Sequence, residues 1–158
     1  MHGKKMDSRR GFSLIELIIV IAIIGIMATI SSYAYQSYVN NTNLRTAARD
    51  LASDMANTKQ KAVAEGLTYR ITISTGGNGY TITRVNADGT TTDMATKTPT
   101  AFGANLTINS TNYTGNIITF QPRGTISAGT VVLGNSRSST ATITSNITGR
   151  THVAFAIR

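Results

Sequence analysis

Gly11-Phe12-Ser13-Leu14-Ile15-Glu16 marks the point where a short basic leader meets an apolar run that continues to Ile30. Between Phe12 and Ile30 the only formal charge is the carboxylate of Glu16. As a helix rising about 1.5 Å per residue, this run would measure roughly 28 Å, close to the ~30 Å thickness of a bilayer's hydrocarbon core. A lone carboxylate is costly in lipid, so Glu16 is expected to have a function.

Two simple interpretations of this segment explain only part of it. A secretory signal peptide has an apolar core of about 7–15 residues followed by a small-residue cleavage site, and this run is longer. A plain single-span anchor agrees with the four basic leader residues, which the positive-inside rule keeps in the cytoplasm, but it gives Glu16 no role. The four leader residues are Lys4, Lys5, Arg9 and Arg10.

The basic leader, glycine, phenylalanine, glutamate and apolar run together resemble the class III signal of type IV pilins and type II secretion pseudopilins. The resemblance implies that residues 1–11 are a leader, that a prepilin peptidase cuts after Gly11 on the cytoplasmic side, and that Phe12 is then N-methylated. Phe12 and Glu16 are four residues apart, so a helix would place them on one face. We expect Glu16 of an incoming subunit to pair with the Phe12 amine of a neighbour during docking.

Composition limits the remaining chain to one helix and one modest domain. Of 158 residues, 41% are hydrophobic and only 14% are charged, and there is no cysteine, which excludes disulfides and cysteine-zinc sites. The formal net charge is +8, of which the leader contributes +3 (four basic residues and Asp7), so +5 remains. These later charges are scattered, which favours a solvated basic surface over a nucleic-acid-binding block.

A helical pattern continues beyond the apolar run. Small and apolar residues recur at helical spacing at Leu44, Ala47, Ala48, Leu51, Ala52, Met55, Ala62 and Val63. They predict an amphipathic helix over 41–65 with Gly66 as its C-cap. Because no proline lies between Phe12 and Gly66, we expect one long helix of roughly 53 residues. Residues 12–40 would be its transmembrane or filament-core part, and 41–158 a periplasmic globular domain.

Alternating strand patterns occupy the rest of the chain. Residues 69–74 and 80–85 flank the glycine-rich turn 75–79 and predict a hairpin, and 86–89 predicts a second turn. Residues 88–104 have few large apolar groups and contain Pro99, which predicts a loop. Further strands are expected at 106–108, 117–120, 130–133, 141–145 and 152–157. The predicted fold class is α+β, with an antiparallel sheet over 67–158 packed on the second half of the helix.

A second motif lies in the C-terminal half. Phe120-Gln-Pro-Arg-Gly124, followed by Gly149-Arg150 before the last strand, resembles the GspH/FimT/FimU branch of minor pseudopilins and minor pilins. By themselves, Pro122 and Gly124 predict a tight turn, because proline fixes φ and glycine permits a positive φ. Major pilins commonly have a helix-bending proline and paired C-terminal cysteines, and both are missing here. Their absence favours a minor subunit.

Some FimT-type relatives bind DNA through a Gly-Arg-x-Arg motif. Here the second arginine is replaced by His152, which is largely neutral at pH 7. Four arginines are candidates for a phosphate-binding patch: Arg123, Arg137, Arg150 and Arg158. No interleaved aromatic residues support base stacking.

Nothing in the sequence predicts catalysis, a cofactor or a metal. No Ser-His-Asp, HExxH or phosphate-loop pattern occurs, and Asp88 and Asp93 are too few for a calcium loop. The resemblance instead implies a minor pilin or pseudopilin of the inner membrane, with its N-terminus in the cytoplasm, that joins a tip or initiation complex. Its partners would be other pilins, prepilin peptidase/methyltransferase, an assembly platform and lipid, with Gly25 permitting close helix approach. A DNA-binding minor pilin and a major filament subunit are the alternatives.

Overall fold

The computed structural model describes residues 12–76 and 78–158, with the backbone alone at 30, 31, 33 and 34. The leader, and with it the predicted cleavage site at Gly11, lies outside the described residues. Two compact units divide the chain after Gln36, and the second unit is Ser37–Arg158.

One helix, α1 (Leu14–Glu65), contributes to both units, which confirms the predicted long helix. It begins where the Ser13 carbonyl accepts the N–H groups of Glu16 (3.0 Å) and Leu17 (3.2 Å). It ends at Gly66, whose φ of +67° is the left-handed conformation expected of a C-cap. Phe12 precedes the first intrahelical acceptor. The expectation that Phe12 and Glu16 share one helical face is therefore wrong for this chain.

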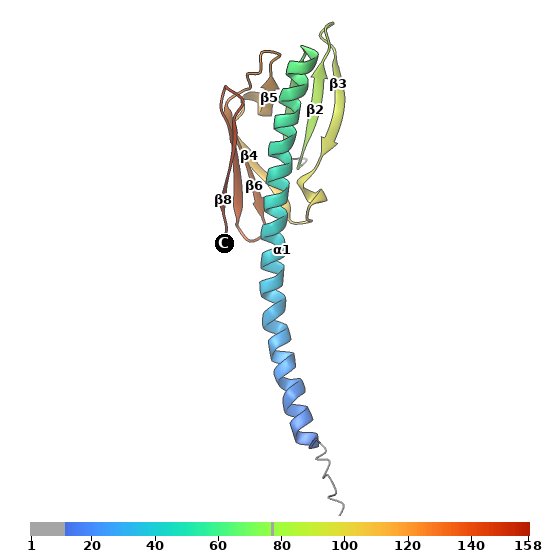
Figure 1. Cartoon of the computed structure of the whole chain (residues 1–158), viewed down its shortest axis with the longest axis vertical. Coiled ribbons are helices and arrows are strands. Elements are labelled where there is room, and N and C mark those ends of the chain that lie inside the picture. The colour runs from blue at the N-terminus through green and yellow to red at the C-terminus, as the bar shows by residue number, and fades with distance from the viewer. Residues whose placement is uncertain (1–11, 77) are drawn as a thin grey trace, which may run out of the picture. The chain divides into compact units, whose positions relative to one another are not determined.

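Within the described residues, α1 is followed by strands that form two four-stranded antiparallel sheets instead of the single sheet expected. The first sheet, in the order β3-β2-β1-β5, contains β1 (Thr68–Ser74), β2 (Gly79–Val85), β3 (Thr91–Lys97) and β5 (Ile117–Phe120). The second sheet, in the order β4-β6-β7-β8, contains β4 (Leu106–Thr111), β6 (Gly129–Asn135), β7 (Thr140–Ser145) and β8 (Thr151–Ala156). In Figure 1, β2 and β3 flank one side of the second half of α1, and β4, β6 and β8 flank the other. The split arises because β4 pairs with β6 and not with β3.

The core of the second unit lies between α1 and both sheets. The helix contributes Leu44, Ala47, Ala48, Leu51, Met55 and Ala62, and the sheets contribute Tyr69, Ile71, Ile118, Phe120, Val131, Leu133 and Ile143, all buried. The predicted apolar helix face is thus confirmed over most of its length. Val63 is the exception, because half of it remains exposed near the end of the helix, whereas Thr58 is buried.

Strand β3 lies in the segment 88–104, for which the sequence pattern predicted a loop, and that prediction is wrong for Thr91–Lys97. β3 pairs with β2 across a register shift at Ile82/Thr83, and almost all of its residues are exposed. An edge strand with no buried face needs no apolar alternation, while its threonines suit extended backbone. Pro99 instead begins the short 3-10 helix η1 (Pro99–Ala101), and a second 3-10 turn, η2 (Thr114–Asn116), precedes β5. The turn predicted at 86–89 is confirmed by the Gly89 N–H bond to the Asn86 carbonyl at 3.0 Å.

Asn78 links the two sheets. Its Nδ2 donates to the Leu106 carbonyl at 2.8 Å, and its Oδ1 accepts the Ile108 N–H at 2.8 Å. The side-chain amide therefore bonds to strand β4 as a neighbouring peptide group would. Asn78 comes from the β1–β2 hairpin, so this pair of bonds ties the turn of one sheet to the edge of the other.

We predict that Asn78→Asp lowers the free energy of unfolding by about 1–3 kcal/mol at pH 7, because the carboxylate cannot donate to the Leu106 carbonyl. The substitution keeps an acceptor for Ile108 and tolerates the positive φ of 47° at this position. Urea unfolding measures the change. Asn105→Asp is the matched control, since Asn105 is exposed; equal losses for the two variants would contradict the role given to Asn78.

Candidate functional site

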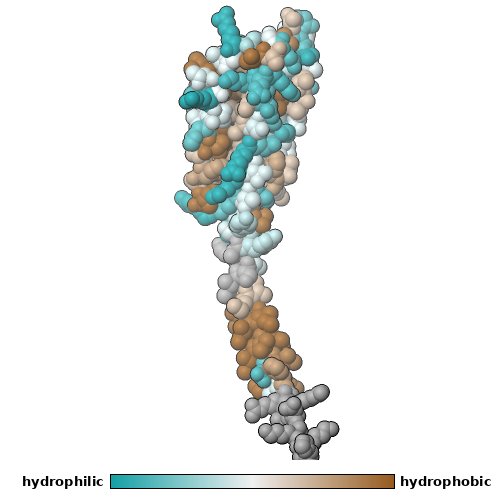
Figure 2. Space-filling view, viewed as in Figure 1, coloured by the Kyte–Doolittle hydropathy of each residue, from teal (hydrophilic) through white to brown (hydrophobic). Residues whose placement is uncertain are grey.

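The first half of α1 presents apolar side chains in every direction. Large exposed apolar residues are Phe12, just before the helix, and within it Leu14, Ile15, Leu17, Ile18, Ile19, Val20, Ile21, Ile23, Ile24, Ile26 and Met27. Figure 2 shows this part of the helix as a mostly brown segment with a small hydrophilic patch near its lower end. An apolar surface of this extent marks a place where another molecule, lipid or protein, covers the chain. A Cβ placed on Gly25 would meet nothing within 4 Å, so a neighbouring helix can approach there.

Glu16 is exposed in the first turn of α1, where the helix dipole favours a carboxylate.

Among the residues that the structure describes, no helix combines the length and the apolar character that a membrane crossing requires.

The two C-terminal motifs form turns of the same type, which confirms the predicted tight turn. In the first, the Gly124 N–H donates to the Gln121 carbonyl at 2.9 Å; in the second, the Gly149 N–H donates to the Asn146 carbonyl at 2.9 Å. The φ angles of the two glycines are +82° and +78°. Each glycine therefore occupies a left-handed position that other residues adopt at a cost.

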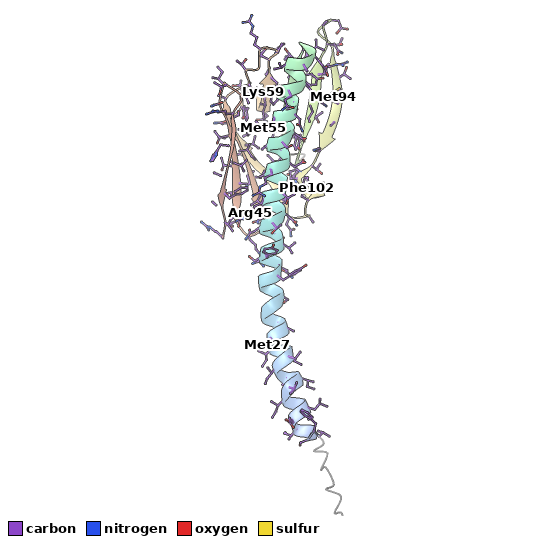
Figure 3. The ribbon with its side chains drawn as sticks, viewed as in Figure 1. Met27, Arg45, Met55, Lys59, Met94 and Phe102 are labelled. Atoms are coloured by element: carbon purple, nitrogen blue, oxygen red, sulfur yellow. The ribbon has the colours of Figure 1, made fainter. Side chains whose placement is uncertain are left out.

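Lys59 of α1 brings these turns together. Its side chain lies beside both Gly124 and Gly149, and its Nζ donates to the Thr148 carbonyl at 3.0 Å. Figure 3 labels Lys59 on the helix, and β5, before the first turn, lies close to this part of α1 in Figure 1. The position of Lys59 in the helical pattern predicts only an exposed residue, so the sequence gives no sign of these contacts.

The four candidate arginines do not form a single patch. Arg123 and Arg150 lie in or beside the two turns around Lys59. The N–H of Arg158 instead donates to Ser139 Oγ at 3.0 Å, next to the turn that carries Arg137. Strands β7 and β8 pair from Thr140↔Ala156 to Ser145↔Thr151, which separates the two pairs by about 17 Å at ~3.3 Å per residue.

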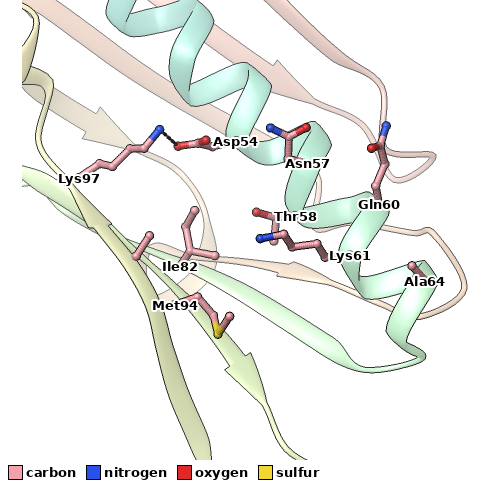
Figure 4. A pocket seen from close by; sticks show the side chains of 10 residues that line it. Asp54, Asn57, Thr58, Gln60, Lys61, Ala64, Ile82, Met94 and Lys97 are labelled. Carbon is pink, nitrogen blue, oxygen red and sulfur yellow. Dashed lines mark ion pairs between the residues drawn. The ribbon is translucent and has the colours of Figure 1, made fainter.

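A cluster of charges ties the edge strand β3 to the helix. Lys97 Nζ lies 2.9 Å from Asp50 Oδ2 and 2.8 Å from Asp54 Oδ2, as Figure 4 shows for Asp54. The Tyr80 hydroxyl donates to Asp54 at 2.7 Å and to Asp50 at 3.2 Å. Lys97 thus separates two like charges one helical turn apart, which would otherwise destabilise the helix. The i, i+4 spacing of Asp50 and Asp54 was the sequence signal for this cluster.

The cluster shifts two pKa values. Burial, followed by the hydrogen bonds to Asp54 and Asp50, raises the pKa of Tyr80 far above its usual value. Burial opposes the charge of Lys97, but its bonds to the same two carboxylates outweigh that effect and raise its pKa. Both groups therefore keep their protons at neutral pH and serve as donors.

A shallow cleft of about 450 Å³ lies beside this cluster, between α1 and the first sheet. Figure 4 shows Asn57, Thr58, Gln60, Lys61 and Ala64 on the helix side and Ile82 and Met94 on the strand side. In the described part of the chain, no group of three or more His, Cys, Asp or Glu side chains is placed to hold a metal ion. The charged residues around the cleft hold β3 against α1.

A long N-terminal helix whose second half packs against two antiparallel sheets defines the chain as a pilin-type subunit. A family model described as type II transport protein GspH matches residues 47–149, and a second model, the prokaryotic N-terminal methylation motif, matches residues 6–32. The chain belongs to the GspH family, which consists of structural pilins and pseudopilins.

Solved structures agree on the fold. The minor pseudopilin EpsH from the type 2 secretion system of Vibrio cholerae aligns with a TM-score of 0.61 at 10% identity, over 71% of this chain and 96% of that one. The type IV minor pilin FimU of Pseudomonas aeruginosa aligns with a TM-score of 0.57 at 20% identity, over 74% and 92%. At these identities, the likeness concerns the fold alone.

Curated relatives match a shorter part of the chain. The type IV major alpha-pilin of Moraxella bovis is 48% identical over 48 residues, 30% of each chain. A fimbrial protein of Pseudomonas aeruginosa is 39% identical over 61 residues, 39% of each chain. The chain therefore matches well under half the length of these relatives.

We predict that Gly149→Ala costs more stability than Gly124→Ala, although both glycines have a similar positive φ. A Cβ at 149 would lie 2.7 Å from two side-chain carbons of Lys59, whereas one at 124 would be 3.5 Å from Val63, an ordinary contact. Backbone strain of about 1 kcal/mol is common to both. The flexible end of Lys59 can move away from a Cβ at 149, so the excess is the loss of its hydrogen bond to the Thr148 carbonyl, about 1 kcal/mol. When Lys59→Ala is combined with each variant, urea unfolding should show the same loss of stability for Gly149→Ala and Gly124→Ala. A larger loss for Gly149→Ala that persists without Lys59 would contradict the role given to Lys59.

We also predict that the stability of the protein falls above pH ~10 partly through Tyr80. Since folding raises the pKa of Tyr80, the unfolded chain loses this proton first, and the contribution of Tyr80 is complete below pH ~10 and declines above it. In urea unfolding from pH 8 to 11, the free energy of unfolding should decrease less steeply with pH for Tyr80→Phe than for wild type. The difference in slope should be at most ~1.4 kcal/mol per pH unit. The exposed Tyr38→Phe is the control, and an unchanged slope for Tyr80→Phe would refute the assignment.

Proposed function

We propose that this chain is a minor pseudopilin or minor pilin that is processed by prepilin peptidase and assembles into the tip or initiation complex of a filament. The proposal rests on the exposed apolar surface of the first half of α1. The second half of the helix, in contrast, is packed in the core of the globular unit. Residues 12–40 would supply the surface that neighbouring subunits cover in the filament. Family membership supports assembly with other pilins.

Before assembly, lipid of the bacterial inner membrane would cover the same surface. In this state the leader is cytoplasmic and the globular unit periplasmic. The match to the N-terminal methylation motif over 6–32 supports cleavage after Gly11 and methylation of the new Phe12 amine by a prepilin peptidase/methyltransferase. An inner-membrane assembly platform would then receive the processed chain. Intact mass of the membrane-extracted protein tests this step: we expect loss of residues 1–11 and one added methyl, whereas a full-length mass would contradict it.

Glu16 would guide the transfer from membrane to filament. An unpaired carboxylate inside lipid is unfavourable, by about 2.5–3.5 kcal/mol at the helix centre and less near its end. Pairing with the Phe12 amine of a neighbouring subunit removes that cost only when the two helices are in register. Phe12 lies before the start of α1. Cleavage after Gly11 would turn its peptide nitrogen into a charged amine, which Glu16 of a neighbouring subunit could then pair with.

We predict that Glu16→Ala leaves membrane insertion unchanged and reduces incorporation into filaments. Removing the carboxylate makes the helix more apolar, so the membrane fraction should hold as much protein as wild type, while sheared filaments should contain several-fold less. Glu16→Gln is the matched variant, because it keeps the shape and removes the charge. Normal incorporation of both variants would contradict the proposed pairing.

The secretion and the pilus settings share this mechanism. The GspH family match and the fold of EpsH support a secretion pseudopilus, and the fold of FimU supports a type IV pilus. Low abundance in sheared filaments would support a minor subunit, whereas a dominant band would establish the major-subunit alternative.

A DNA-binding minor pilin is the second candidate, favoured by Arg123 and Arg150 on neighbouring turns around Lys59. Arg150 is exposed beside a depression lined by Thr144, Asn146, Thr151 and His152. Phosphates would contact these cations, so affinity should fall steeply with salt. A mobility shift with duplex DNA tests it: binding that disappears in Arg150→Ala would establish the candidate, and no binding by the wild-type protein would eliminate it.

A further inference from the structure

Charge is distributed unevenly over the unit Ser37–Arg158. We call the base of this unit residues 37–45, the hairpin residues 75, 76, 78 and 79, residues 98–106, the turn 135–139 and residues 156–158. Not one aspartate or glutamate occurs in these segments, whereas they contain three arginines: Arg45, Arg137 and Arg158. The carboxylates of the unit lie further along, at Asp50 and Asp54 paired with Lys97, at Glu65, and in the β2–β3 hairpin at Asp88 and Asp93.

Direct contacts hold these segments at one end of the unit. Asn41 donates to the Arg158 carbonyl at 3.4 Å, and Asn135 donates to Asn41 at 3.1 Å. Leu106 pairs with Asn135 at the start of β4, and Asn78 bonds to Leu106.

The arginines present their charge at this end. Arg45 and Arg158 are exposed, and Arg137 is half-buried in its turn. The guanidinium of Arg45 lies 5.7 Å from the ring centre of Phe155 on β8, which holds it against the base. With three arginines and no acidic side chain, the base carries a positive charge.

We infer that this base binds the anionic headgroups of the membrane in which the chain waits before assembly. The inference rests on the proposed membrane state. The chain enters the base at Ser37 from the apolar residues 14–29, and the connecting residues 30–36 measure about 10 Å as a helix. That length is comparable to the headgroup layer of ~5–8 Å and to the Debye length of ~8 Å at physiological salt.

Aromatic residues around this connection fit the same layer. Tyr35 and Tyr38 are 69% and 70% exposed, respectively. Tyrosine is enriched at membrane–water interfaces because its ring is apolar and its hydroxyl is polar. The sequence therefore passes from apolar residues through exposed tyrosines into a base whose only charged side chains are cationic. A bilayer with anionic headgroups offers matching layers: hydrocarbon for the apolar residues, the interface for the tyrosines and phosphates for the arginines.

Docking by the base would hold the globular unit near the bilayer until neighbouring subunits compete for the helix. Each arginine near an anionic surface favours binding by roughly fivefold. Such contacts are weak enough to break when the subunit leaves the membrane. Arg123 and Arg150, at the opposite end of β7 and β8, provide a matched pair that should not contribute.

The test uses the full chain in nanodiscs. Because the protein has no cysteine, Ser136→Cys places one fluorophore on an exposed position of the 135–139 turn, and Ile147→Cys places one at the far end. Energy transfer to a headgroup-labelled lipid is compared in neutral phosphatidylcholine and in discs that also contain phosphatidylglycerol. We expect stronger transfer from position 136 in anionic discs, a decline with salt, and no such difference from position 147.

Arg137→Gln with Arg158→Gln should reduce the ratio of docked to undocked protein about 25-fold, while Arg123→Gln with Arg150→Gln leaves it unchanged. The Arg→Lys pair at 137 and 158 should restore docking, and Arg45→Gln, at an exposed site, should lower it without affecting the fold.

Equal transfer in both kinds of disc would overturn the inference while leaving the proposed function intact. A chain that enters neither disc would overturn the membrane state itself. Duplex DNA bound through Arg137 and Arg158, with no lipid dependence, would replace lipid with nucleic acid as the ligand.

Discussion

The burial of one face of α1 against two sheets is the constraint on which the globular unit depends. Leu44, Leu51 and Met55 are almost fully enclosed, and each such side chain contributes about 1.5–3 kcal/mol when it leaves water. Within the described residues, no strand of one sheet pairs with a strand of the other. The chain therefore needs further ties between them, and Asn78 provides one through two hydrogen bonds to β4. Lys97 provides another by fastening the exposed strand β3 to Asp50 and Asp54.

The same helix has a different environment along its length. In the second half its own sheets cover the apolar residues, whereas in the first half the apolar residues remain exposed on every side. A surface of this kind is stable only in lipid or among other helices. Processing at Gly11 and the charge of Glu16 would determine when neighbouring helices replace lipid on this surface. The proposed function thus depends on the half of α1 that the chain's own sheets leave uncovered.

Local sequence patterns predicted the elements that repeat with a fixed period. The spacing of Ala47, Ala48 and Leu51 identified the buried helix face, and Gly66 and Gly124 identified positions of positive φ. The strand β3 was missed because an exposed edge strand has no buried face to produce alternation. The division into two sheets was also missed, because the partner of β4 is decided by long-range pairing with β6.

The site was predictable to a similar degree. The junction at Gly11, Phe12 and Glu16 and the glycine turns are visible in the sequence as motifs. The contact of Lys59 with both turns is not, since Gly124 and Thr148 lie about 65 and 89 positions from it in the sequence. The sequence suggested one patch of four arginines. The pairing of β7 with β8 instead puts Arg123 and Arg150 at one end of these strands and Arg137 and Arg158 at the other. The sequence shows which side chains could bind a partner, but only the fold shows which of them lie close together.

In-cell cysteine cross-linking along α1 tests most directly whether its two halves are covered by different molecules. The protein contains no cysteine, so a single substitution reports on one position. With a dimaleimide cross-linker and the filament machinery present, Ile18→Cys should give products of two or more subunits, and Ala48→Cys, enclosed by its own sheets, should give none. Cross-links at position 48, or their absence at position 18, would contradict a helix that is half core and half assembly surface.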